Sequence, residues 1–572
     1  MPATYIGFDL SSSGLKCLAV TADLKPVHEE AILFDKDTPH YGVHGGVHKN
    51  EVDHEVYAPV AMWIEALDIL LTQMKASGFD FSSVKGISGA GQQHGSVYWS
   101  EKAEEILASL DPKASLVDQL KDGAFTHPWS PNWQDHSTQK ECEQFEEATG
   151  GGEALARITG SKAHHRFTGP QIKKFHRQNP EVYEKTARIS LVSSFLCSLF
   201  LGRIAPLDIS DVCGMNLWDI QGDCWDKKLL ALTAEDSKSG VAGLSAKLGN
   251  VAHNMGSILG GISKWFVERF GFSSDCAILP FTGDNPSTIL ALPLRPLDAI
   301  VSLGTSTTLL MSTPTYYPST EYHLFNHPTT KGLYMFMLCY CNGALAREGV
   351  RDEINKSKGV TDKSWAEFGK AVDSTQVAGR STSSDPAKIG VYFPLPENIP
   401  SANKGTWRYN YSATDGTIKE TQEGWNLPHD DVRAIIESQA LSMRMRSEAL
   451  LSPDAHNGHK AQPRRLYFVG GGSRNAAIMS ITAEVLGGFE GAYKLDIGSN
   501  ACALGASYYA AWALERKGSE AFEDYVDRYW EEETHAVRIG DAYKEGVWEE
   551  YGSVMKGFRI VEEEIMKTNS HA

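Results

Sequence analysis

The chain has little cysteine and no long hydrophobic run. Its nine cysteines are scattered, odd in number and without C-x₂-C spacing, which predicts a reducing compartment rather than a disulfide framework or zinc site. The longest apolar run, residues 189–201, is too short to span a bilayer and predicts a buried helix. Asp9 interrupts the first apolar run, so no signal peptide is expected. We therefore expect a cytoplasmic protein.

The chain also has no excess of basic residues over acidic ones. The chain has 54 basic and 72 acidic residues, a net charge of −18, which argues against nucleic acids and anionic membranes as partners. Any bound phosphate must be held by backbone donors and a few local cations. With 572 residues, 42% apolar and 22% charged, the chain has the composition of a globular protein of two or more domains.

A Ser/Thr/Gly hairpin pattern occurs twice, at residues 5–20 and 298–311. In an alignment by eye, Ser12 and Ser13 of the first copy fall on Thr305 and Ser306 of the second. Small residues at such a turn let backbone N–H groups point at an anion. Two copies half a chain apart predict two related lobes that face one nucleotide, with Ser12, Ser13 and Thr305 as contacts.

Short apolar strands alternate with amphipathic helices, which is typical of an α/β fold. The pattern predicts a lobe boundary near residues 292–298, and hence domains at 1–292 and 293–572. The stretch 374–426 has no clear pattern, and the acidic segment from residue 518 is expected to be a solvated helical terminus. The predicted helices span residues 56–74, 186–200, 364–373 and 432–451.

A glycine turn at residues 470–475, GGGSRN, lies between a predicted strand and a predicted helix. It resembles a dinucleotide fingerprint in which Asn475 replaces the third glycine and Asp496 lies near the spacing of the ribose-binding acid. That alternative leaves the two hairpins unexplained. It therefore ranks below a second interpretation, in which this turn binds the adenosine part of a nucleotide. For Gly470, a purely structural role in the turn is as well supported as contact with a nucleotide. Gly471, Gly472 and Asn475 are predicted nucleotide contacts.

Six segments of the chain carry a family resemblance: DLSSSGLK, GQQHGSVYW, RFTGPQI, FTGDNP, SLGTSTT and FVGGGSRN. Together, these segments resemble the FGGY carbohydrate kinases of the actin/hexokinase-like superfamily, over residues 5–512. Within that family the sequence is most similar to the eukaryotic D-xylulose kinases. The resemblance implies a two-lobed α/β fold with a ribonuclease H-like core in each lobe. The family patterns differ at residues 173–176 and 393–400, so no site residue is assigned within 391–400.

The resemblance implies a sugar site made of His94, Arg166, Asp284 and Asn285, with Asp284 as the catalytic base. A structural histidine in a glycine-rich turn is the alternative for His94, and a solvated surface arginine is the alternative for Arg166. For Asp284 the alternative is a helix N-cap before Pro286. Both roles are compatible, because a helix N-terminus favours the ionised carboxylate that accepts a proton.

The resemblance also implies ATP and Mg²⁺ as cofactors. Trp365 is expected against the nucleotide, although a core tryptophan is nearly as well supported. Asp9 is expected to hold the magnesium ion, through water. The regularly spaced His40, His44 and His48 lie among glycines that oppose a helix, so a loop is favoured there over a metal site.

The sequence therefore predicts an ATP-dependent kinase that converts D-xylulose to D-xylulose 5-phosphate, with the sugar and ATP as its partners. Phosphoryl transfer depends on positioning and charge neutralisation more than on covalent chemistry. One alternative is a kinase for another ketose or polyol, such as ribulose. The other is a non-catalytic actin-like sugar or ATP sensor, which the intact Asp284 disfavours.

Overall fold

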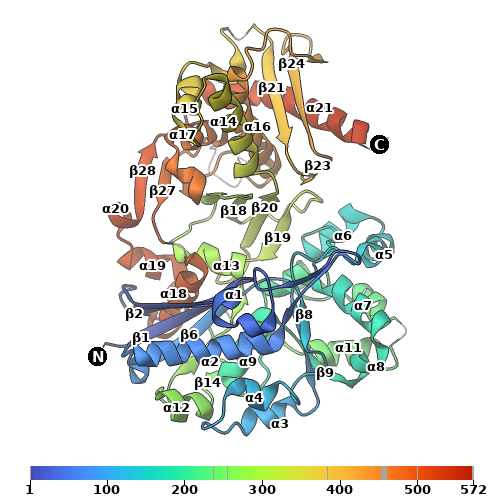
Figure 1. Ribbon diagram of the computed structural model, residues 1–572, viewed down its shortest axis with the longest axis vertical. Coiled ribbons are helices and arrows are strands. Elements are labelled where there is room, and N and C mark those ends of the chain that lie inside the picture. Colours follow the sequence, from blue (N-terminus) through green and yellow to red (C-terminus); the bar gives the residue numbers. More distant parts are fainter. Residues whose placement is uncertain are drawn as a thin grey trace.

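The computed structural model describes residues 2–235, 237–253, 256–382, 384–451, 460–498 and 500–569, which form two stacked lobes (Figure 1). Each lobe is built on a seven-stranded sheet in which a hairpin lies beside a parallel strand. The lower sheet contains β14 (Gly260–Gly261), β15 (Ala277–Ile278), β6 (Val84–Gly91), β1 (Thr4–Leu10), β2 (Gly14–Thr21) and β3 (Pro26–Leu33), with β16 (Thr282–Gly283) on β6. The upper sheet contains β19 (His323–Asn326), β20 (Tyr334–Tyr340), β18 (Thr307–Thr313), β17 (Ala299–Leu303), β26 (Leu466–Val469), β27 (Ala492–Leu495) and β28 (Ala536–Gly540).

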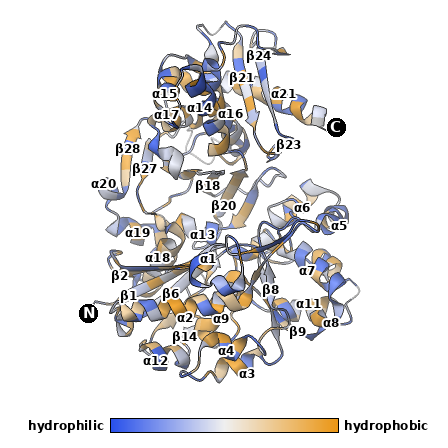
Figure 2. Cartoon of the chain, in the orientation of Figure 1, coloured by the Kyte–Doolittle hydropathy of each residue, from blue (hydrophilic) through white to orange (hydrophobic). Residues whose placement is uncertain are grey.

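The lower sheet is covered on both faces, so β1 is buried along its whole length. Successive side chains of a strand alternate between faces. Ile6 and Phe8 belong to the core formed with α2 (Val60–Ala76) and α9 (Val192–Leu201). Gly7 lies against α18 (Ala501–Glu515) on the other face, and a Cβ at Gly7 would lie 1.9 Å from the Ala503 carbonyl oxygen. Figure 2 shows the hydrophobic residues of the helices around this sheet.

The position of α18 differs from the expected division of the chain at residue 292. This helix belongs to the second half of the sequence, yet it packs on β1, β2 and β6 of the lower lobe (Figure 1). The sequence pattern could not show this, because an amphipathic helix reveals that it has a partner but not which sheet the partner is.

In the upper lobe, the helices α14 (Ala344–Ser357), α16 (His429–Ser447) and α17 (Ala476–Leu486) belong to one hydrophobic core with the sheet. The unassigned stretch contributes a three-stranded sheet of β21 (Ala387–Phe393), β24 (Gly405–Tyr411) and β25 (Ile418–Glu420). The expectation of a solvated terminus after residue 518 was wrong: β28 pairs with β27, and α21 (Val547–Asn569) packs on α16 and α17.

The helix predicted over residues 186–200 was wrong at its start. Residues 186–191 form β9 (Thr186–Leu191), which pairs with β7 (Ser96–Ser100), and only then does α9 begin. Ile189 and Leu191 continue into the apolar residues of α9, and a short apolar run fits a buried strand as well as a buried helix. The helix predicted over residues 56–74 also began too early, because residues 56–59 belong to β5 (Glu55–Pro59) and α2 starts at Val60. The remaining two predicted helices correspond to α15 (Ala366–Asp373) and α16.

Strand β19 connects the two lobes. The Ser210 hydroxyl donates a 2.6 Å hydrogen bond to the Asn326 carbonyl, and the Leu324 amide donates a 2.9 Å bond to the Gly160 carbonyl. All nine cysteines lie in the described part of the chain, and none forms a disulfide. None of the helices within the described ranges is long and apolar enough to cross a membrane.

Candidate functional site

His94 lies at the end of β6 in a turn where its φ is +77°, a left-handed conformation that is unusual for a non-glycine residue. Its ring stacks on Phe167 at 4.5 Å, and its Nδ1 lies 3.0 Å from the Gly214 carbonyl. Because a carbonyl can only accept, Nδ1 carries the proton and Nε2 is left as an acceptor. Burial, together with the Arg166 charge, lowers the pKa of His94 well below its usual range, so the ring is neutral.

Arg166 also lies against Phe167, with its guanidinium 5.6 Å from the centre of that ring. Its Nη2 is 3.2 Å from Nε2 of His323, a residue of the upper lobe. Arginine remains protonated, so His323 accepts this hydrogen bond and donates from Nδ1 to Ser161 Oγ at 2.9 Å. His323 is 4% exposed, so a buried contact from the upper lobe orients the arginine.

Asp284 begins the short helix α13 (Asp284–Thr288) directly after β16. Gly283, not Asp284, is the N-cap residue, and the Asp284 carboxylate accepts a 2.8 Å hydrogen bond from the Asn285 amide. The Asn285 side chain donates to Asp284 at 3.0 Å and to Gln93 Oε1 at 3.1 Å. Gln93 therefore connects this turn to the loop that carries His94.

Several carboxylates share this region. Burial raises the pKa of Asp284 to about 6, and burial together with the Asp284 charge raises the pKa of Asp9 to about 7. Burial also raises the pKa of Asp211 to about 7, although Ser193 donates to it at 2.6 Å. In addition, Asp9 Oδ1 is buried without any hydrogen-bond partner. A buried, unpartnered carboxylate oxygen is costly, and a cation or its water shell would satisfy it.

The tip of the first hairpin is next to the same loop. Ser12 Oγ receives a 2.7 Å hydrogen bond from the Trp133 indole and lies 3.2 Å from Gln92 Oε1. Gln92 and Gln93 are adjacent, so Ser12, His94, Asn285 and Asp284 belong to one connected group. The side chain of Ser13 is exposed at the hairpin tip.

A second group lies in the upper lobe, where the parallel strands β17 and β26 end at the same edge of the sheet. The Thr305 carbonyl accepts from the Gly343 amide at 3.1 Å, and Asn475 caps α17 by accepting from the Ala477 amide at 3.0 Å. Gly472 packs so closely on β17 that a Cβ would lie 2.8 Å from Leu303 Cβ. Thr305 and Gly471 are exposed at this edge.

Arg347, one turn into α14, reaches the same edge but was not predicted as a site residue. It is 1% exposed, and its Nη1 donates to Gln439 Oε1 at 2.5 Å. Its Nη2 is buried without a hydrogen-bond partner and lies 3.3 Å from the position of a Cβ on Gly472. Burial lowers the pKa of Arg347 to about 10, so it remains a cation at neutral pH.

Trp365 stands apart from both groups. It precedes α15, its ring lies 4.9 Å from the Arg351 guanidinium, and Phe368 packs on its edge at 5.0 Å. The three regularly spaced histidines do not converge either: His40 lies 3.1 Å from Glu65, and His48 stacks on Tyr57. Nowhere among the described residues do three metal-ligating side chains cluster.

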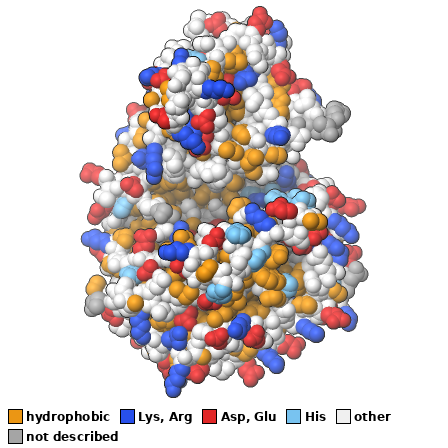
Figure 3. Space-filling model, viewed as in Figure 1, with side chains coloured by type: hydrophobic (Ala, Val, Ile, Leu, Met, Phe, Trp, Pro, Cys, Tyr) orange, Lys and Arg blue, Asp and Glu red, His pale blue; other side chains and the backbone are white. Residues whose placement is uncertain are grey.

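The space-filling view shows the molecule hollowed between the lobes, with histidine and basic side chains gathered at the right-hand end of the hollow (Figure 3). Residues 131–291 match the N-terminal domain of the FGGY family of carbohydrate kinases, and residues 299–514 match its C-terminal domain. The chain belongs to the FGGY family of carbohydrate kinases. The predicted family and the predicted actin/hexokinase-like fold are thus confirmed.

This FGGY kinase is similar in sequence to fungal relatives. It is 58% identical to a probable D-xylulose kinase A of Aspergillus flavus over 565 residues, which cover 98% of both chains. It is 56% identical to D-xylulose kinase A of Aspergillus niger over 564 residues, again 98% of both chains.

Solved structures of low sequence identity share its fold. A xylulose kinase from Rhodospirillum rubrum superposes with a TM-score of 0.74 at 16% identity, covering 99% of this chain and 100% of the other. Plasmodium falciparum glycerol kinase with ADP superposes with a TM-score of 0.70 at 15% identity, covering 98% and 99%. Kinases for different substrates match about equally well, so the overall fold does not distinguish the sugar.

Sequence reasoning missed the residues that connect and orient the predicted ones, namely Gln93, Asp211, His323 and Arg347. Gln93 stands beside His94 in the quoted motif, so adjacency was a usable signal. Asp211 is flanked by Ile209, Val212 and other apolar residues, which suggests burial, and a buried carboxylate needs a partner. His323 and Arg347 reach the site from strands and helices distant in sequence, and no local pattern marks them.

Proposed function

We propose that this FGGY kinase transfers the γ-phosphoryl group of ATP to D-xylulose, forming D-xylulose 5-phosphate and ADP. The observation that carries the proposal is the 56–58% identity to fungal D-xylulose kinases over 98% of both chains. The unbroken chain of contacts from Ser12 to Asp284 supports it, since a sensor without catalysis would have no need to keep a carboxylate at that position.

The sugar is proposed to bind between His94, Arg166 and the Asp284–Asn285 turn. Neutral His94 offers an acceptor at Nε2, and Arg166 offers charged donors. These groups are held before the sugar arrives, by Phe167 and by His323. Preorganised contacts of this kind reduce the ordering cost of binding.

Asp284 is proposed to act as the general base. The sugar hydroxyl loses its proton to the Asp284 carboxylate while its oxygen forms a bond to the γ-phosphorus, and the bond from that phosphorus to the bridging oxygen of ADP breaks. A carboxylate with a pKa of about 6 is mostly ionised at pH 7 and still accepts a proton readily. Closure of the lobes over both substrates would exclude water, the competing acceptor.

The nucleotide is proposed to bind along the two hairpins and the glycine turn, through Ser12, Ser13, Thr305, Gly471, Gly472 and Asn475, with Trp365 against the base. Arg347 joins them as a proposed contact to an anionic or carbonyl oxygen, because its unpartnered Nη2 is directed at the Gly472 turn. Mg²⁺ is proposed to lie near Asp9, through water, where it would neutralise phosphate charge; the unpartnered Asp9 Oδ1 fits that role.

A coupled assay of ADP formation tests the proposal. With a panel of D-xylulose, ribulose, glycerol and gluconate, we expect D-xylulose to give the highest kcat/KM. A higher value for another sugar would move the assignment to that substrate, and the absence of sugar-dependent ADP release would favour a sensor.

We also propose a cytoplasmic location, in keeping with nine unpaired cysteines.

A further inference from the structure

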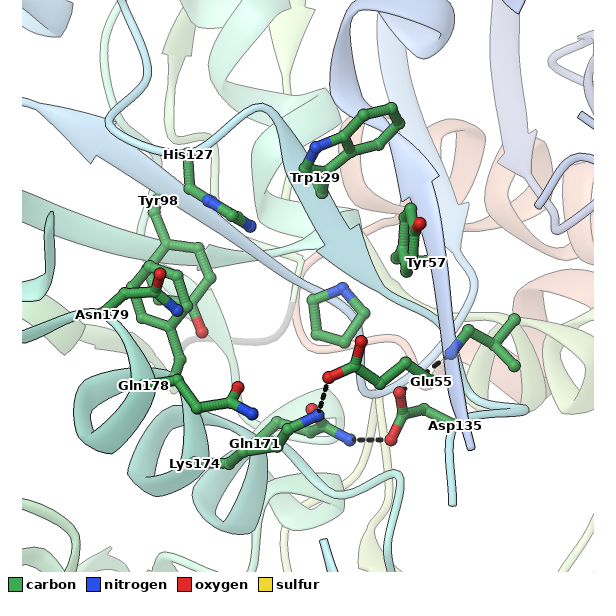
Figure 4. A pocket seen from close by; sticks show the side chains of 13 residues that line it. Glu55, Tyr57, Tyr98, His127, Trp129, Asp135, Gln171, Lys174, Gln178 and Asn179 are labelled. Carbon is green, nitrogen blue, oxygen red and sulfur yellow. Dashed lines mark hydrogen bonds and ion pairs between the residues drawn. The ribbon is translucent and has the colours of Figure 1, made fainter. Parts of the chain in front are cut away.

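A separate cavity of about 320 Å³ lies in the lower lobe, between α7 (Thr168–Gln178) and the small sheet of β4 (His48–Asn50), β5 (Glu55–Pro59) and β8 (Trp129–Pro131) (Figure 4). We propose that it is a second binding site, for a neutral sugar or polyol of about pentose size. Cavities of 300 Å³ or more that combine aromatic walls with a few polar groups are typical of small-molecule sites.

The cavity is distinct from the proposed sugar site, although both are in contact with α7. The first turn of α7 serves the sugar site, because Thr168 Oγ1 donates to the His94 carbonyl at 2.9 Å. The cavity instead uses residues from Gln171 to Asn179. At a helical rise of 1.5 Å per residue, Gln178 lies about 15 Å along the axis from Thr168.

The walls of the cavity combine flat aromatic rings with free polar groups. Tyr57 and Trp129 meet edge to face at 5.2 Å on the side of the small sheet, and Tyr98 lies opposite, stacked on Phe175 at 4.1 Å (Figure 4). Figure 4 shows the amide of Gln178 turned into the space between them. Within the described part of the chain, the side chains of His127, Gln178 and Asn179 have no hydrogen-bond partner. Aromatic rings suit the C–H faces of a sugar, and amides suit its hydroxyls.

The charges of the cavity argue for a neutral ligand. Among the described residues that line it, Lys174 is the only cation, and it is already bound by Glu55 at 2.6 Å and by Ser137 Oγ at 2.7 Å. Asp135, a second carboxylate, accepts from Gln171 at 2.7 Å and from the Val56 amide at 3.0 Å. Burial lowers the pKa of His127 to about 4, so that ring adds no positive charge at pH 7. A sugar phosphate or nucleotide would thus meet carboxylates with no free cation to balance them.

Equilibrium dialysis without nucleotide tests the inference, using radiolabelled D-xylulose in one arm and radiolabelled xylitol in the other. For a ligand of ten heavy atoms we expect a Kd on the order of 1 mM at the cavity. At least one of the two ligands should bind there. The Arg166→Ala protein, altered in the proposed sugar site, should therefore still bind one mole of that ligand per mole of protein.

The decisive variant is Gln178→Trp, in which an exposed residue at the cavity mouth is enlarged to block entry. Combined with Arg166→Ala, it should abolish the one equivalent of ligand that Arg166→Ala alone still binds. Glu181→Trp, at an exposed neighbour that does not line the cavity, should retain that binding in the same background. No binding of either ligand to Arg166→Ala, or binding that persists in Arg166→Ala/Gln178→Trp, would overturn the inference. If the wild-type protein binds no further D-xylulose beyond what Arg166→Ala binds, the proposed substrate is in doubt and the cavity site is not. The two failures are therefore distinguishable.

Discussion

The proposed sugar side and the proposed nucleotide side of this kinase are built in different ways. On the sugar side, His94, Arg166 and Asn285 are each held by another side chain or a carbonyl before any ligand binds. On the proposed nucleotide side, several candidate residues lie in exposed turns, such as Ser13 and Thr305 at the tips of the two hairpins.

The difference follows from what each side must recognise. A sugar is told from its isomers by the directions of its hydroxyls, so its partners must be fixed side chains. A triphosphate carries charge on every side, and backbone N–H groups at the ends of strands and helices meet it without side-chain specificity. Substitutions on the sugar side should therefore change selectivity and chemistry, whereas those on the nucleotide side should mainly change the affinity for ATP.

The largest effect is expected at Asp284. Asp284→Asn retains the shape and the hydrogen bonding of the turn but cannot accept a proton. General-base catalysis contributes about 10²- to 10⁴-fold, so kcat should fall on that scale while KM for ATP hardly changes. Steady-state kinetics checks this, with the exposed carboxylate variant Asp275→Asn as a control. Near-normal turnover by a folded Asp284→Asn protein would make the residue merely structural.

The next effect is expected at Arg166. Arg166→Ala removes a charged donor worth about 1.5–3 kcal/mol, so kcat/KM for D-xylulose should fall roughly ten- to a hundredfold, with KM for ATP unchanged. The exposed Arg157→Ala in the same lobe serves as the control. An unaltered kcat/KM for the sugar would remove Arg166 from the site and weaken the contrast between the two sides.

Arg347 sharpens the comparison, because it is the one buried charged side chain proposed on the nucleotide side. Arg347→Met replaces a buried cation by an apolar chain of similar length, a change that often leaves stability intact. We expect KM for ATP to rise about tenfold, the effect of one charged hydrogen bond, while KM for D-xylulose stays constant. If only the melting temperature changes, Arg347 is a structural residue.

The pH dependence tests the carboxylates of the sugar side. Because the base must be ionised and burial raises the pKa of Asp284 to about 6, kcat/KM for D-xylulose should decline as the pH falls through 6. One pH unit lower, the loss should be about tenfold. A pH–rate profile at saturating ATP measures it. A profile that remains flat down to pH 5 would be inconsistent with Asp284 as the base.

The smallest effect is expected at Trp365. Arg351 and Phe368 already pack on this ring, so a nucleotide would meet only part of it. Trp365→Ala should raise KM for ATP a few-fold, corresponding to about 0.5–1.5 kcal/mol for an aromatic contact. The variant Trp407→Ala, in the sheet with β21, controls for the loss of an indole. Equal KM values in the two variants would leave Trp365 as a core residue.

The family, the fold class and both hairpins could be predicted from the sequence, because they depend on local patterns. One Ser/Thr/Gly turn between apolar strands is an ordinary hairpin, but two copies half a chain apart indicate two related lobes. The FTGDNP and GQQHGSVYW segments carry their chemistry in adjacent residues. The same local signals placed Asp284 at a helix start and Asn475 at the beginning of α17, where the structure has them. The roles of the candidate site residues remain predictions.

Only the tertiary structure decided which distant segments meet. The packing of α18 on the lower sheet, the hydrogen bond from Arg166 to His323 and the hydrogen bond from Arg347 to Gln439 all join residues far apart in the chain. Periodicity records that a residue is buried but not what it is buried against. Burial also sets the raised pKa of Asp284, so the readiness of this proposed base to accept a proton is a property of the folded protein.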